Sequence, residues 1–196
     1  MNSIRQLFVI AVVLSCTLSH AQDFLWHDKD GKTVPDNDHQ KTRDGFGAMM
    51  LFTDDEKVFE NWQKPEQPKI RNISTAQRGV PVHVLLIFAS PGRDAEGKSN
   101  VTYDAKALKP DGSVYSEFKD LVALKGAGPP SGYLQLSPAA MAIRIEPEDP
   151  AGSYTVEIVV RDNVRKVELK LKDKFTVEVH NTDPELEQMI WDVEHL

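Results

Sequence analysis

Short apolar segments, several of them alternating with polar residues, run through the middle of the chain. Val82 to Ala89 is almost continuously apolar, as expected of a strand buried on both faces or of a sandwich core strand. Further on, Val101, Tyr103 and Ala105 alternate with polar residues, which is the period of a half-buried strand. Residues 110–112, Pro-Asp-Gly, then predict a tight turn, because proline presets its backbone angle and glycine accepts a positive φ.

The same pattern continues toward the C-terminus. Gly132 to Ser137 and Ala140 to Ile145 predict two short strands, and the alternation from Tyr154 to Arg161 predicts a longer one that ends at an Asp162-Asn163 turn. A last alternating stretch runs from Lys166 to Val179, and we expect a bulge in it at Lys172-Asp173-Lys174. About seven short strands with turn signals between them are typical of an all-β, antiparallel β-sandwich.

Helical patterns flank these strands. Thr53 and Glu56 have the spacing of a capping box, and a short helix should follow until Pro65. Near the C-terminus, Asp183 can cap a second helix that has Pro184 at its first position. Its apolar residues have helical spacing and form a stripe, which we expect to dock on the protein's own body. They are Leu186, Met189, Ile190 and Val193.

The first 21 residues have the three parts of a secretory signal peptide. Arg5 supplies the positive charge, Leu7 to Leu14 is the apolar core, and small residues at Ser19 and Ala21 predict cleavage after Ala21. The apolar run is shorter than the roughly 20 residues that span a bilayer, and no other segment is apolar enough to span one. Residues 13–16 also resemble a lipobox, so lipidation of Cys16 stays an alternative.

Four regions follow from these patterns. They are a signal peptide (1–21), an N-terminal hairpin and helix segment (22–77), a β-sandwich domain (78–180) and a C-terminal helix (181–196). Cys16 is the only cysteine, so the mature chain would have no disulfide, no thiol nucleophile and no cysteine metal ligand. The net charge of −7 becomes −8 when Arg5 is lost, which argues against nucleic acid and anionic membranes as main partners.

One strand corner resembles immunoglobulin-like domains. In residues 149–156, Asp-Pro-Ala-Gly-Ser-Tyr-Thr-Val, Tyr154 takes the place of the tyrosine that ties the strand corner to upstream backbone in those domains. Val156 takes the place of their usual cysteine. The resemblance implies an immunoglobulin-like sandwich and no particular function, because such sandwiches serve many functions.

A second resemblance covers residues 26–34, Trp-His-Asp-Lys-Asp-Gly-Lys-Thr-Val. They are similar to a short hairpin module of unknown function in exported proteobacterial proteins, with a two-residue turn at Asp30-Gly31. The resemblance implies a secreted or periplasmic protein of a Gram-negative cell envelope. In such a bacterial host, the sequons at Asn72 and Asn100 carry no expectation of glycosylation.

A cluster of histidines and aspartates is the main candidate for metal binding. It lies within thirteen residues, and its imidazoles and carboxylates are ordinary ligands of divalent ions. Its spacing fits no metal-site template, so we expect a solvated loop and no bound metal or cofactor. The cluster consists of His27, Asp28, Asp30, Asp36, Asp38 and His39.

Three further segments have both a purely structural and a functional interpretation. Gly45 and Gly47 have dinucleotide spacing but no third glycine, which favours a turn over residues 44–48. The loop from Lys125 to Gly132 is expected to be a plain connector, with ligand binding as the alternative. A basic stretch either receives an acidic partner or protects a sheet edge, and we favour edge protection. It contains Arg161, Arg165, Lys166, Lys170, Lys172 and Lys174.

No catalytic motif is apparent, and the sequence predicts no catalytic, cofactor or metal residue. We therefore expect an exported cell-envelope protein that is a non-enzymatic interaction or accessory module of unknown specific role, whose partner, if it has one, is an unidentified protein. Two alternatives stay open. One is a periplasmic metal- or glycan-binding protein, and the other is a hydrolase whose site is assembled from distant residues.

Overall fold

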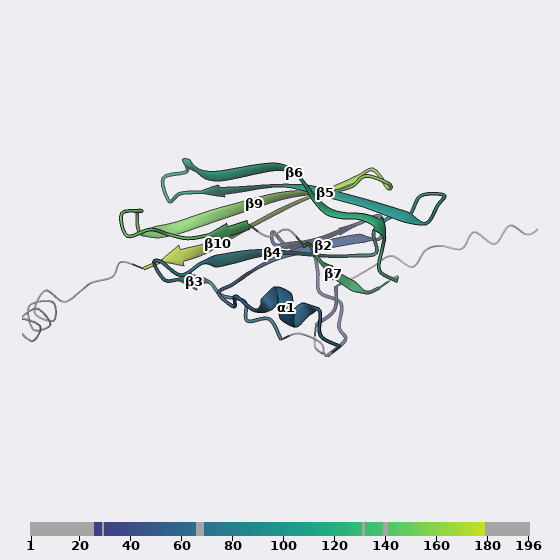
Figure 1. Ribbon diagram of the computed structural model, residues 1–196, viewed down its shortest axis with the longest axis horizontal. Coiled ribbons are helices and arrows are strands. Elements are labelled where there is room, and N and C mark those ends of the chain that lie inside the picture. Colours follow the sequence, from purple (N-terminus) through teal and green to yellow (C-terminus); the bar gives the residue numbers. More distant parts are fainter. Residues whose placement is uncertain (1–25, 29, 66–68, 131, 139–140, 179–196) are drawn as a thin grey trace, which may run out of the picture.

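The computed structural model describes residues 26–28, 30–65, 69–130, 132–138 and 141–178. In this part the protein is an all-β structure of two five-stranded sheets with one short helix, α1 (Val58–Trp62). Figure 1 shows the sheets as two layers, with α1 against the outside of the layer that contains β4. The C-terminal helix expected at 181–196 and the signal peptide lie outside the described residues.

The first sheet has the strand order β1-β2-β4-β7. β8 also pairs with β4, at the other end of that strand from β7. Its pairings are antiparallel. The five strands are β1 (Gln40–Arg43), β2 (Phe46–Thr53), β4 (Val82–Ala89), β7 (Leu134–Leu136) and β8 (Met141–Ile143). The segment 22–77 therefore contributes two strands to this sheet in addition to the hairpin and helix that its sequence predicts.

The second sheet has the order β3-β10-β9-β5-β6. It is antiparallel apart from the two-residue parallel pairing of β3 with β10. Its strands are β3 (Thr75–Ala76), β5 (Lys98–Leu108), β6 (Val114–Ala127), β9 (Gly152–Asp162) and β10 (Val167–Val177). The described residues thus contain ten strands rather than about seven.

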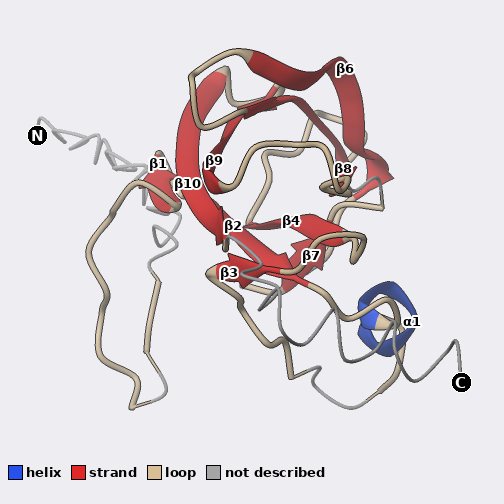
Figure 2. Cartoon of the chain, turned by 90° about the vertical axis from the view of Figure 1, so that its left-hand side faces the viewer, coloured by secondary structure: helices blue, strands red, loops and turns tan. Residues whose placement is uncertain are grey.

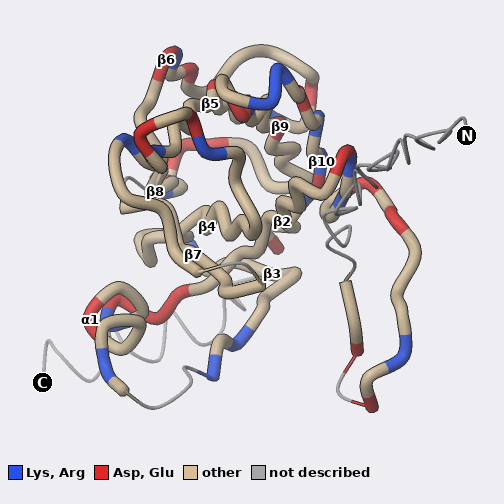
Figure 3. The backbone as a smooth tube through the Cα atoms, turned by 90° about the vertical axis from the view of Figure 1, so that its right-hand side faces the viewer, with Lys and Arg blue, Asp and Glu red and all other residues tan. Residues whose placement is uncertain are grey.

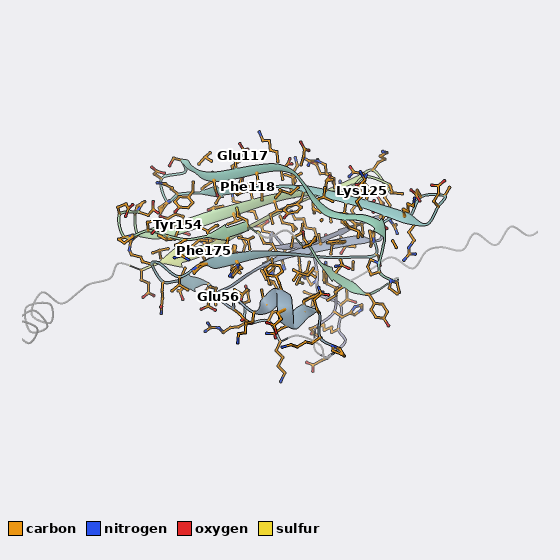
Figure 4. The ribbon with its side chains drawn as sticks, in the orientation of Figure 1. Glu56, Glu117, Phe118, Lys125, Tyr154 and Phe175 are labelled. Atoms are coloured by element: carbon orange, nitrogen blue, oxygen red, sulfur yellow. The ribbon has the colours of Figure 1, made fainter. Side chains whose placement is uncertain are left out.

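One core lies between the sheets, and a smaller one lies under α1. Val84, Leu86 and Phe88 of β4 face the other sheet, while Leu85 and Ile87 pack with Val58 of α1. This confirms that Val82–Ala89 is a strand buried on both faces. Between the sheets, the ring of Phe175 stacks on Tyr154 at 5.6 Å and meets Phe52 edge-on at 5.4 Å. Tyr154 and Phe175 are labelled in Figure 4.

Several local predictions are corrected by the structure. The helix begins at Val58 with no side-chain cap, because the Thr53 hydroxyl accepts the Asp55 amide at the end of β2 instead. The β10–β9 register is continuous from Val167 to Val177, so the bulge expected at residues 172–174 is absent from β10. Only Asp44 and Gly45 form the turn predicted over 44–48; the residues after them belong to β2.

Three connections share one turn geometry that explains their sequences. In each, a glycine with positive φ donates its N–H to the carbonyl three residues before it, and this holds for Gly31, Gly97 and Gly112. The predicted hairpin at 26–34 is confirmed, with an antiparallel bridge between His27 and Thr33. The amide of Asp28 bonds to the carbonyl of Lys32, so three residues lie between these two. The loop is therefore one residue longer than the expected two-residue turn.

Candidate docking surface on the open edge

The aspartates of the N-terminal cluster are used mainly by their own backbone. One carboxylate oxygen of Asp28 accepts the amides of Asp30 and Lys32, and the Asp36 carboxylate accepts the amide of Thr42. The main chain of Asp38 accepts the amide of Lys172 in β10, which joins this segment to the second sheet. Among the described residues, no three His, Cys, Asp or Glu side chains come together as a metal site.

The basic stretch of β9 and β10 is largely neutralised by ion pairs on the outer face of the second sheet. Arg161 lies 2.6 Å from Asp104 and 3.3 Å from Glu168, and Lys172 lies 3.1 Å from Glu157. The Arg161 guanidinium, which donates a hydrogen bond to Asp104, lowers the pKa of that carboxyl. Figure 3 shows the two signs of charge mixed on this part of the molecule. This stretch is therefore not a free cationic surface.

A polar cluster closes the end of the molecule where β5 turns into β6. The hydroxyl of Tyr115 lies 2.8 Å from the carboxylate of Asp149, and Lys109 lies 3.3 Å from the same side chain. Burial and the hydrogen bond to Asp149 raise the pKa of Tyr115. Burial acts to raise the pKa of Asp149 as well, but hydrogen bonds from Tyr115, the Glu146 amide and Lys109 outweigh it and lower that pKa. A phenol held protonated beside an ionised carboxylate is a structural pair and a poor general base.

Arg78 binds the backbone of the loop over residues 146–149 at the same end of the molecule. Its guanidinium donates to the backbone carbonyls of Glu146, Pro147 and Asp149 at 2.6 to 3.1 Å. Arg78 also lines a hollow of about 510 Å³ beside β3, together with Glu178. Because the guanidinium is engaged by the 146–149 loop, this hollow offers little free positive charge to a ligand.

The loop from Lys125 to Gly132, which the sequence predicts to be a plain connector, is held against the connection between β4 and β5. Arg93 donates to the carbonyls of Gly128 and Pro129, and the amide of Gly132 donates to the Ser90 hydroxyl. Lys125 is still part of β6. These bonds fix the loop beside β7 and so position the apolar residues that follow it.

The exposed large hydrophobic residues of the described chain gather on one side of the molecule. All of them belong to β6, β7 or the residue before β7, and their exposed fractions run from 41% to 66%. They are Val114, Phe118, Val122, Tyr133 and Leu134. We call this side, where β6 of one sheet faces β7 and β8 of the other, the open edge. A concentration of exposed apolar side chains is typical of an interaction site.

A groove of about 350 Å³ lies within the open edge. Val122 and Leu124 of β6 line one wall, Leu136 of β7 lines the other, and Phe59 of α1 closes the bottom. Lys125 and Gln135 add polar groups at its rim. On the opposite side of the molecule, β10 lies against β1 and β2 (Figure 2), and the Lys172 amide bonds to the Asp38 carbonyl.

Bulges explain why β6 leaves its side chains exposed. At three places along its pairing with β5, β6 has one residue more than its partner, at Tyr115, within Lys119-Asp120 and at Ala123. Asp120 has a φ of 55°, and its amide donates to the Asp104 carboxylate across the bulge. Such bulges twist an edge strand and deter the addition of a further strand. Docking here would therefore use side chains rather than strand pairing.

This surface is not apparent in the sequence pattern. The pattern of residues 114–127 lacks a regular alternation because each bulge shifts the inward-facing period by one residue. Phe118, Glu117 and Lys125 are labelled along β6 in Figure 4.

Within the described part of the chain, no helix is long and apolar enough to cross a bilayer. No protein-family model and no curated protein matches the sequence.

Solved structures provide only loose likenesses. A family 123 glycoside hydrolase from Clostridium perfringens matches with 13% identity and a TM-score of 0.41, over 68% of this chain and 27% of that one. The DNA glycosylase AlkC of Pseudomonas fluorescens, bound to DNA, matches with 16% identity and a TM-score of 0.35, over 54% and 28%. A Niemann-Pick type C2 protein from the Japanese carpenter ant matches with 15% identity and a TM-score of 0.34, over 66% and 89%.

The chain thus spans little more than a quarter of the length of the first two structures. None of the three reaches a TM-score of 0.5, so none of them assigns this chain a fold family or a function.

Proposed function

We propose that the protein is an exported, non-enzymatic interaction module of the cell envelope, and that it docks a protein partner through the open edge. The observation that carries this proposal is the gathering of the exposed large hydrophobic residues on β6, on β7 and at Tyr133, the residue before β7. Elsewhere on the described surface, the outer faces of the strands are polar or half-buried. An apolar patch of this kind is costly to leave in water and is usually covered by a partner.

The chemistry of the open edge favours a protein as the partner. Phe118 and Val122 stand among Glu117, Lys119 and Lys125, so apolar contacts are ringed by charges of both signs. Protein interfaces have this composition, with an apolar centre and a polar rim. The net charge of −7 disfavours nucleic acid and anionic lipid, whose binding depends on basic surfaces.

The polar clusters support a non-enzymatic role in a direct way. Asp104, Asp149 and Asp162 each accept hydrogen bonds that join separate strands or loops, and their partners are backbone amides or fixed side chains. Groups committed in this manner stabilise the fold. A catalytic base needs a free lone pair directed at a substrate.

We further infer that the two-sheet body is an immunoglobulin-like sandwich. In support, the Tyr154 hydroxyl donates to the carbonyl of Pro150 at 2.8 Å, as the tyrosine corner of that family requires. The side chain of Val156, two residues later, is fully buried at the position of the family's usual cysteine. Export to the cell envelope rests on the sequence of residues 1–21 and on the resemblance of the 26–34 hairpin.

The docking proposal can be tested in producing cells with a photo-crosslinking amino acid. The probe replaces Val122 on the open edge or, as a matched control, Val159 on the outer face of the same sheet, where the side chain is only half-buried. We expect a discrete adduct of higher mass from position 122 and none from position 159. Adding Phe118→Ser should reduce the adduct about tenfold or more, because a lost apolar contact of roughly 1.5–3 kcal/mol weakens binding by that factor.

Stability serves as the second readout. Because Phe118 is 45% exposed, Phe118→Ser should change the melting temperature little. Equal adducts from positions 122 and 159, or an adduct that is insensitive to Phe118→Ser in a folded protein, would contradict the proposal.

A further inference from the structure

We propose that the C-terminal segment Asn181–Leu196 docks as a helix along the open edge of its own chain and competes there with the partner. This inference rests on the proposed function, because it concerns the regulation of the same surface. Two apolar surfaces are candidates to cover each other, one in the described structure and one predicted from the sequence. One is the open edge, and the other is the stripe of Leu186, Met189, Ile190 and Val193.

The strand register brings the end of the described chain to the start of the open edge. Val177 of β10 pairs with Gly152 of β9, and Thr155 of β9 pairs with Leu108 of β5. Leu108 in turn pairs with Val114, the first residue of β6. The described chain therefore ends at the same end of the sheet where the open edge begins, three strands away. Three inter-strand steps across the sheet, combined with the three-residue offset from Gly152 to Thr155 along β9, amount to about 17 Å.

The length of the remaining chain matches this path. Residues 179–183 reach about 17 Å when extended, which is enough to cross the end of the sheet. The predicted helix from Pro184 to Leu196 is then about 20 Å long. The eight residue-to-residue steps from Val114 to Val122 extend at most about 26 Å, and the bulges of β6 shorten that distance. A helix of this length thus covers the open edge from Val114 to the neighbourhood of Val122.

The shape of the open edge favours a helix over a strand as its occupant. The three bulges of β6 and the charges at Glu117, Lys119 and Asp120 prevent a strand from pairing in register along it. On the opposing side, β7 and β8 have only three residues each. A helix satisfies its own backbone hydrogen bonds, and its width of about 10 Å matches the separation of two stacked sheets. The segment from Asp183 onward has the cap and the apolar stripe of such a helix.

Disulfide trapping tests this arrangement in the full chain. Cys16 is replaced by serine, which leaves no other cysteine. The edge pair combines Lys119→Cys, beside Phe118, with Gln188→Cys in the C-terminal segment. The control pair combines Lys174→Cys with Gln188→Cys. Lys174 is an exposed lysine on β10 only four residues before Glu178, so a segment without a docking site would meet it at least as often.

We expect the edge pair to oxidise about tenfold faster than the control pair, because docking raises the local concentration of one thiol near the other. Adding Ile190→Asp should slow the edge pair to the control rate and leave the control pair unchanged. An edge pair that is no faster than the control, or one that is insensitive to Ile190→Asp, overturns the inference. A disulfide that joins two copies, seen as a doubled mass, overturns docking within one chain.

The failure of this inference can be separated from the failure of the proposed function. A chain that ends at Asn181 and has the crosslinker at position 122 should give more partner adduct than the full chain, since its competitor is gone. If the edge pair fails to form while the adduct persists, docking of the segment is wrong and the proposed function stands. If the edge pair forms but neither chain length gives an adduct, the proposed function is wrong and docking stands.

Discussion

At the scale of single residues, the most consequential side chain is Asp162. It is fully buried, and its carboxylate accepts the amides of Gly92 at 2.5 Å and of Val164 and Arg165 at 3.0 Å. The Arg165 side chain, 3.6 Å away, also donates to the carbonyl of Asp44. A Cβ added at Gly92 would lie 2.5 Å from Arg165, so only glycine fits there. One buried charge therefore holds together the connections after β1, β4 and β9.

Asp162→Asn should lower the free energy of unfolding by about 2–4 kcal/mol, because an amide would leave a buried N–H facing the amides that the carboxylate now accepts. Urea denaturation of the purified protein measures the loss. Asp173→Asn is a suitable control, since that half-buried carboxylate accepts the amide of the next residue, and its effect should stay below about 0.5 kcal/mol. Equal losses for the two variants would contradict the role given to Asp162.

Sequence patterns predicted a turn at Asp162-Asn163, but they did not predict that the Asp162 side chain is buried. Gly92 and Asp44, which surround it, are 70 and more residues away, and no local pattern predicts that their loops converge. Tyr154 was easier to interpret, because its hydroxyl bonds to Pro150 only four residues away. Local hydrogen bonds can be predicted from a sequence when their spacing is known, whereas sites assembled from distant loops cannot.

At the scale of elements, β6 determines what the molecule presents to its surroundings. Phe118, paired with the buried Ala105, and Val122, paired with the half-buried Thr102, are both exposed along this irregular edge strand. The Asp104 carboxylate stabilises one bulge by accepting the Asp120 amide and the Arg161 guanidinium. The same bulges obscured β6 in the sequence, while the regular alternation of β5, β9 and β10 made those strands predictable. The patch and groove of the open edge could not be foreseen, because they depend on an irregular strand.

The contribution of Asp104 should depend on pH. Its pKa is lowered in the folded protein, chiefly by the hydrogen bond from Arg161, so its stabilisation is present above the unfolded pKa of about 3.9 and is lost as pH falls through the lower folded value. Asp104→Asn should therefore reduce the free energy of unfolding by about 0.5–1.5 kcal/mol at pH 7. The gap to the unmodified protein should close as the pH falls toward 2 to 3.

Urea denaturation at a series of pH values measures this gap. Glu96→Gln, on the exposed turn before β5, controls for the loss of one negative charge. A gap for Asp104→Asn that stays constant from pH 7 to below pH 3 would show that the Asp104–Arg161 pair does not carry the stabilisation.

At the scale of the whole molecule, the two sides of the body differ. On one side β10 meets β1 and β2 and the sheets are joined, while on the other side the open edge exposes apolar residues. The alternating pattern predicted an all-β protein correctly. It did not predict that β1 and β2 join the first sheet, because the two glycines of residues 44–48 favoured a turn over a stretch that includes the start of β2. Sheet membership depends on pairing partners distant in sequence, which periodicity does not encode.

The compartment of the molecule is the last prediction, and it bears on both proposals. If residues 1–21 are a signal peptide, protein from the cell envelope should have Gln22 as its first residue, which intact-mass measurement will detect. Ala21→Leu should block this cleavage, because the peptidase requires a small residue there, whereas Ser19→Ala keeps a small residue and should leave cleavage intact. A lipid on Cys16, or a mass that retains Met1 to Ala21 in the unmodified chain, would contradict it. Cleavage also removes Cys16, so the open edge would meet its partner in an oxidising compartment on a chain that has no thiol to exchange.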